Sequence, residues 1–62
     1  MSSAAEFRRR WRLDQGELAE RLGVHRVTVS KWERGRQQEP GWLRLALIGL
    51  SVELAGELGI AK

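Results

Sequence analysis

The stretch that decides the fold is QGELAERLGVHRVTVSKW, residues 15–32. Counted from Gln15 as the first place, apolar residues stand at places 4, 8, 10, 15 and 18, a small residue at place 5 and a glycine at place 9. Two helices joined steeply by a short turn need a small side chain where they cross and a residue that tolerates positive φ in the turn. The stretch therefore predicts two short helices whose apolar side chains pack against each other. The apolar residues are Leu18, Leu22, Val24, Val29 and Trp32, and the small ones are Ala19 and Gly23.

Capping residues predict where these two helices begin and end. Asp14 is a favourable N-cap, and Glu17 stands three residues later, so the first helix is predicted to begin directly after Asp14. Gly23 fits a left-handed cap at its end. The second helix is entered from His25 or Val24 and is closed by Gly35, so that the two-helix unit covers residues 15–34.

A further helix is predicted upstream, over residues 4–12. Ser3 and Glu6 have the S-x-x-E spacing of a capping box, which marks a helix start. The apolar residues that follow recur at helical spacing, so they share one face. They are Ala4, Phe7 and Trp11.

Residues 40–58 are predicted to be helical and to carry two apolar stripes, which implies two buried faces. Pro40 suits the first helical turn, where its missing N–H would be unpaired in any case. Gly49, Ser51 and Gly56 leave two possibilities open: one helix, or two short helices with a bend near Ser51. One stripe is Leu43, Leu47, Leu50, Leu54 and Leu58, and the other is Leu45, Ile48, Val52 and Ala55.

These elements predict one all-α domain over residues 1–62, a compact bundle of four or five helices. Sixty-two residues are close to the lower size at which one core folds unaided. The chain has no cysteine, and the only soft metal ligands, His25 and Met1, lack partners, so we expect neither a disulfide framework nor a zinc site. Stability is expected from packing, aided by a second subunit.

The charge distribution favours an anionic partner. Eleven Lys and Arg oppose eight Asp and Glu, and the net charge is +3. Most of the cations precede Gln37, so one end of the chain is basic. Residues 1–12 are too polar for a signal peptide, and residues 42–50 are too short to span a bilayer. We therefore expect a cytoplasmic, nucleoid-associated protein with no membrane contact.

The stretch DQGELAERLGVHRVTVSKWERG, together with the upstream Arg8, resembles the Cro/cI-type helix-turn-helix family, also called XRE-type or lambda repressor-like. The resemblance covers about two thirds of the chain. In that family an arginine seven residues before the first residue of helix two pairs with a glutamate near the end of the recognition helix. Arg8 and Glu33 occupy those places, and we expect a structural ion pair rather than a DNA contact.

The resemblance implies that residues 26–34 form the recognition helix and enter the major groove of double-stranded DNA. Arginine and lysine can bind guanine, and Val27 can pack on a thymine methyl group. Residues at the ends of the helix and in the loop after it are expected to bind phosphates. The predicted base contacts are Arg26, Val27, Thr28, Ser30 and Lys31; the predicted phosphate contacts are Gln15, His25, Arg34, Arg36 and Gln38.

The remaining conspicuous residues have ordinary interpretations. Ser30 lacks a base partner and a cleft, so we expect no enzyme, and we expect no cofactor and no small-molecule ligand. The three tryptophans are interpreted as core, because each falls on an inward stripe. Four further arginines are interpreted as solvated charges: Arg9, Arg10, Arg12 and Arg21.

The second stripe of residues 40–58 favours a homodimer, since an exposed strip of Leu45, Ile48 and Val52 is unusual for a soluble monomer. The leading hypothesis is a repressor of bacterial, phage or mobile-element origin that binds an inverted repeat. We expect so short a chain to have no room for a sensor domain. The alternative is the antitoxin of a toxin–antitoxin pair, with the stripes binding the toxin. An end at Lys62, soon after Ile60, counts against that alternative.

Overall fold

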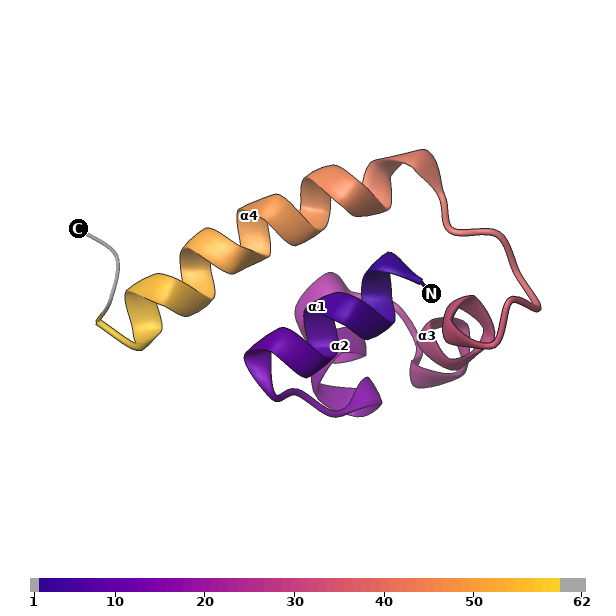
Figure 1. Cartoon of the computed structure of the whole chain (residues 1–62), viewed down its shortest axis with the longest axis horizontal. Helices are drawn as coiled ribbons and strands as arrows, with labels where there is room; N and C mark the ends of the chain where they lie inside the picture. Colours follow the sequence, from indigo (N-terminus) through magenta and orange to yellow (C-terminus); the bar gives the residue numbers. More distant parts are fainter. Residues whose placement is uncertain (1, 60–62) are drawn as a thin grey trace.

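The computed structural model describes residues 2–59, which form four α-helices and no strand (Figure 1). They are α1 (Ser3–Trp11), α2 (Gln15–Leu22), α3 (Arg26–Glu33) and α4 (Gly41–Glu57). The first three helices form a compact group, and α4 runs beside α1 with its C-terminal end reaching past that group (Figure 1). The all-α prediction with four helices is confirmed. Met1, Ile60 and Lys62 lie outside the described residues.

The core is built from the apolar face of every helix. Leu18 from α2, Val29 from α3 and Leu43 from α4 are completely or almost completely shielded from solvent. Of the other apolar residues of the two-helix unit, Trp32 is also buried, whereas Leu22 and Val24 pack against the core at partial exposure. The core cluster is Ala4, Leu18, Ala19, Val29, Trp32, Leu43, Leu47, Leu50 and Leu54, with Phe7, Trp11, Leu13, Leu22 and Val24 packed against it.

The turn between α2 and α3 has the predicted chemistry. Asp14 and Glu17 form both hydrogen bonds of a capping box at the start of α2. Gly23 ends α2 at φ 73°, in the left-handed region that glycine adopts without a Cβ clash. His25 then caps α3, because its Nδ1 accepts from the backbone N–H of Val27 at 3.1 Å. These caps fix where α2 ends and where α3 begins, so that only residues 23–25 separate the two helices.

The start of α1 corrects one prediction. Its N-cap is Ser2, whose hydroxyl accepts from the backbone N–H of Ala5 at 2.9 Å, and not Ser3. The backbone N–H groups of Ser3 and Ala4 instead donate to the carboxylate of Glu39, at 3.3 and 3.0 Å. A carboxylate is a favourable partner for free N–H groups at a helix start. Glu39 thus ties the loop after α3 to the first turn of α1.

The C-terminal segment is one unbroken helix of 17 residues, α4. Pro40 is its N-cap rather than part of its first turn. Gly49 and Gly56 do not bend it, and a Cβ at either position would meet nothing within 4 Å. Two predicted core residues are exposed: Trp42 by 49%, although its ring meets Trp32 edge-on, and Leu58 by 66%.

Arg12 adopts an unfavourable backbone conformation at the end of α1, with φ 56° and ψ 44°. This left-handed region costs a non-glycine residue about 1–2 kcal/mol. We expect Arg12→Gly to raise the free energy of unfolding by about 0.5–1 kcal/mol, after the extra chain entropy of glycine is subtracted. Urea denaturation followed by circular dichroism measures the change. Arg10→Gly, within the same helix, should lower stability instead; a loss in both variants would contradict the prediction.

Candidate nucleic-acid interface

A shallow hollow of about 480 Å³ brings together most of the side chains that were predicted to meet DNA. Arg26, Ser30 and Arg34 stand four residues apart along α3 and its C-cap, so they share one face. The opposite face of α3 carries Val29 and Trp32, which are buried. The hollow is lined by Gln15, Arg26, Val27, Ser30, Lys31, Arg34 and Arg36.

Three of the predicted contact residues do not line this hollow. Thr28 is half-buried on the side of α3, and Gln38 lies farther along the loop, beside Glu39 in a separate hollow. His25 is exposed, but its Nδ1 is occupied by the helix cap. A neutral imidazole that accepts at Nδ1 carries its proton on Nε2, so that nitrogen is left as a donor.

An ion pair fixes α1 against the end of α3. The guanidinium of Arg8 donates to both carboxylate oxygens of Glu33, from Nε at 2.8 Å and from Nη2 at 2.9 Å. These hydrogen bonds hold the pKa of Glu33 below its ordinary value of 4.5 and raise the pKa of Arg8, while partial burial opposes both shifts. The side chains are 23% and 10% exposed, so the pair is shielded from water.

Gln15 joins this ion pair, a link that the sequence analysis missed. Its side-chain amide nitrogen donates to Oε1 of Glu33 at 3.2 Å, across a separation of 18 residues. No local spacing encodes such a contact. The amide keeps a second N–H for another acceptor. Arg8 and Glu33 therefore set the position of a residue that lines the hollow, besides holding α1 to α3.

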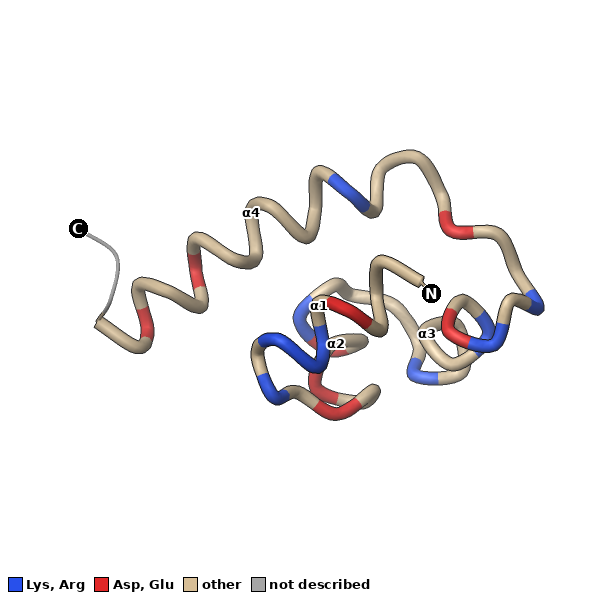
Figure 2. The backbone as a smooth tube through the Cα atoms, in the orientation of Figure 1, with Lys and Arg blue, Asp and Glu red and all other residues tan. Residues whose placement is uncertain are grey.

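The charges are unevenly arranged along the fold. Figure 2 shows lysine and arginine on the second half of α1, on α3 and in the loop after it, whereas acidic residues follow the single cation of α4. Arg26, Lys31, Arg34 and Arg36 are exposed cations around the hollow. Arg21, predicted to be a solvated charge, instead forms a bidentate ion pair with Glu57 of α4, in which Nη2 donates at 2.8 Å. The face around the hollow suits a polyanion.

Two short helices joined by a tight turn, with cations on the outer face of the second, define a helix-turn-helix protein. The chain belongs to the Cro/C1-type, XRE-like helix-turn-helix family, which matches residues 6–41, more than half of the 62 residues. Searches of curated proteins and of solved structures found no significant match. The family is one of DNA-binding, non-enzymatic domains, and the chain is a DNA-binding protein.

The family match ends at the first residue of α4, so the rest of α4 lies beyond it. None of the helices within residues 2–59 has the length and apolarity required to cross a membrane.

Proposed function

We propose that the protein is a sequence-specific regulator of transcription, a repressor that reads double-stranded DNA with α3 in the major groove. The observation that carries this proposal is the hollow lined by Arg26, Ser30 and Lys31 of α3. The opposite face of α3 is buried in the core and holds these side chains in place. The major groove admits an α-helix, and arginine donates two hydrogen bonds to O6 and N7 of guanine. Arg26 and Lys31 are the main specificity residues in this proposal.

The other contacts divide by chemistry. Val27, which is 51% exposed, packs on a thymine methyl group, and Thr28 and Ser30 bind bases or phosphates. The remaining polar residues hold the protein on the phosphate backbone and carry little sequence information. They are Gln15, His25, Arg34, Arg36 and Gln38.

We propose further that the protein acts as a homodimer on an inverted repeat, in the cytoplasm and on nucleoid DNA. Its recognition helices would then meet half-sites one helical turn apart, about 34 Å. Leu45, Ile48 and Val52 are 72%, 55% and 65% exposed, which supports an apolar interface on α4. The repressor blocks polymerase by occupying the operator. A sedimentation experiment that finds only monomer at high concentration would argue against the dimer.

An antitoxin that also binds DNA is the second candidate. The same exposed face of α4 favours it, because an apolar strip can take a toxin as well as a second copy. The two candidates predict different oligomeric states for the isolated protein. A stable dimer of the isolated protein favours the repressor, and a monomer that still selects DNA favours the antitoxin.

Arg26→Ala tests the assignment of α3 as the recognition helix. Loss of a bidentate guanine contact is expected to weaken specific binding by about 1–3 kcal/mol and to relax one base position per half-site. Selection of bound sequences from random DNA, followed by titration of the best site, measures both effects. Gln15→Ala is the comparison, since loss of a phosphate contact should weaken all sequences alike. Unchanged specific binding by Arg26→Ala would show that another residue reads the base.

A further inference from the structure

Gly16, in the first turn of α2, differs from the other glycines of the chain. All seven glycines lie within residues 2–59. A Cβ added at Gly16 would stand 3.3 Å from Oδ1 of Asp14 and 3.6 Å from Cδ of Arg26, whereas at each of the other six it would meet nothing within 4 Å. Glycine is also a poorer helix former than alanine. The missing side chain at position 16 thus leaves a space that Arg26 borders.

The side chain of Arg26 reaches from α3 to the first turn of α2. Arg26 is the first residue of α3, and its Cδ lies beside the backbone of Gly16, which is half-buried. Arg26 lines the hollow described above and also a second hollow of about 350 Å³, which Gly16 lines with it. An arginine can pack its methylene groups on a surface while its guanidinium stays in water. The stem of Arg26 therefore lies against α2, and the residue remains exposed for a ligand.

We propose that Gly16 is a specificity-determining position, because it lets the stem of Arg26 rest on α2 in the geometry that reads a base. The proposal rests on the proposed function, in which Arg26 binds a guanine, and adds a residue on another helix that controls this contact. Ordering a long side chain costs conformational entropy. A stem that already packs on α2 loses less freedom when its guanidinium meets the guanine, so binding is stronger.

Of the two neighbours of Gly16, Arg26 is the one that a larger residue would displace. Oδ1 of Asp14 accepts from the backbone N–H of Glu17 at 2.7 Å, as part of the capping box. Its displacement would cost α2 its N-cap. Arg26 is exposed and has several rotatable bonds, so it can turn away into solvent. A bulky side chain at position 16 therefore moves Arg26 off α2 and leaves the cap in place.

Gly16→Val tests the proposal in a titration of the full chain with the best DNA site selected from random sequences. Valine has two methyl groups on its Cβ and cannot turn both away from Arg26. We expect binding to weaken about 10-fold, within the range of coupling between residues in contact. The preference should be lost at the base pair that Arg26→Ala relaxes. Gly16→Ala should stay within about 2-fold of the parent, because its Cβ stands at an ordinary contact distance from Arg26.

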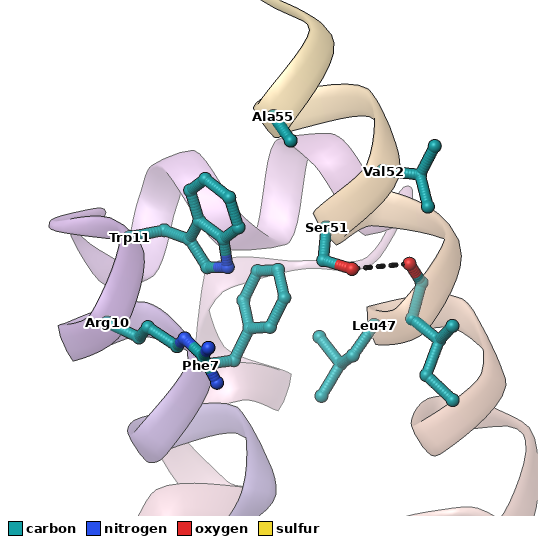
Figure 3. A pocket seen from close by; sticks show the side chains of 8 residues that line it. Phe7, Arg10, Trp11, Leu47, Ser51, Val52 and Ala55 are labelled. Atoms are coloured by element: carbon teal, nitrogen blue, oxygen red, sulfur yellow. Dashed lines mark hydrogen bonds between the residues drawn. The ribbon is translucent and has the colours of Figure 1, made fainter. Parts of the chain in front are cut away.

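A double-mutant cycle separates this coupling from other effects of valine. With Arg26→Ala present, Gly16→Val should change binding by less than about 2-fold, because no long side chain remains to be displaced. Arg10→Ala is the matched control, since it removes an exposed arginine from another place. Figure 3 shows Arg10 at the groove between α1 and α4, which no residue of α3 lines. With Arg10→Ala present, Gly16→Val should keep its effect of about 10-fold.

Equal weakening by Gly16→Val with and without Arg26→Ala would overturn the proposal, since valine would then act on the DNA or on α2 directly. Loss of preference at a different base pair would overturn it too. Valine is no poorer a helix former than glycine, so the fold should be kept, which circular dichroism checks. Gly16→Leu, a stronger helix former, replaces Gly16→Val if helix is lost.

The same experiment distinguishes failure of this inference from failure of the proposed function. A parent protein that selects no DNA sequence would overturn both. A parent that selects a site, with a base preference that Arg26→Ala relaxes and Gly16→Val leaves unchanged, would overturn the role of Gly16 alone.

Discussion

Replacing Leu43 with alanine is expected to leave most of the protein unfolded at room temperature. Leu43 is 1% exposed and packs where α4 meets the rest of the core. Truncation of a buried leucine costs about 2–5 kcal/mol, since the lost contacts leave a cavity behind. A single core in a chain of this size supplies about 3–5 kcal/mol, so the loss equals most of the available stability. Far-UV circular dichroism with urea titration measures it.

Leu45→Ala is the matched control, because it makes the same change two residues away on the exposed face of α4. At a concentration where the protein is monomeric, its cost should stay within about 0.5 kcal/mol. Equal losses for Leu43→Ala and Leu45→Ala would mean that α4 does not present the face described above. The pair of variants therefore tests which side of α4 faces the core.

Arg8→Met is expected to have the second largest effect and to lower the free energy of unfolding by about 1–3 kcal/mol at pH 7. In this variant Glu33 keeps its charge at a position shielded from water but lacks its main partner. Arg21→Met is the comparison, since its partner Glu57 is exposed and can return to water; a much smaller change is expected. The double variant Arg8→Met/Glu33→Leu should recover most of the stability, because no unpaired charge remains. Equal losses for Arg8→Met and Arg21→Met would contradict this account.

The same pair predicts how stability changes with pH. The pKa of Glu33 is lowered in the folded protein, first by the hydrogen bonds from Arg8. A carboxyl group with a lowered folded pKa contributes stability above its unfolded pKa and loses it as the pH falls through the folded pKa. The difference between the parent and Arg8→Met should therefore be full at pH 7 and should shrink as the pH falls from the ordinary glutamate pKa of 4.5 toward the lower folded pKa of Glu33. Urea titrations at several pH values measure that difference.

Local spacing was sufficient to predict the central part of the fold. The capping box of Asp14 and Glu17, the glycine turn at Gly23 and the apolar positions of α2 and α3 act within a few residues of one another. Physical rules for caps and helix faces apply at that range. The pairing of Arg8 with Glu33 came instead from the family resemblance, since 25 residues separate them. The assignment of individual side chains to DNA stays a prediction.

Two of the incorrect predictions share one cause, which is competition from residues distant in the sequence. Ser3 has the sequence pattern of an N-cap, but Glu39 takes up its backbone N–H and Ser2 caps the helix. Trp42 falls on an inward stripe, yet Trp32 fills the core position beside it and leaves Trp42 half exposed. Neither outcome follows from spacing, because each depends on how the loop after α3 returns to α1.

The edge-on contact of Trp32 and Trp42 is expected to give a near-ultraviolet circular dichroism signal. Their ring centroids are 6.0 Å apart and their planes meet at 74°, and the two indoles come from α3 and from the first turn of α4. Rings held rigidly in this way absorb left and right circularly polarised ultraviolet light unequally. Their near-ultraviolet signal therefore reports the docking of α4 on α3, separately from helix content, in every titration proposed above and without an added label.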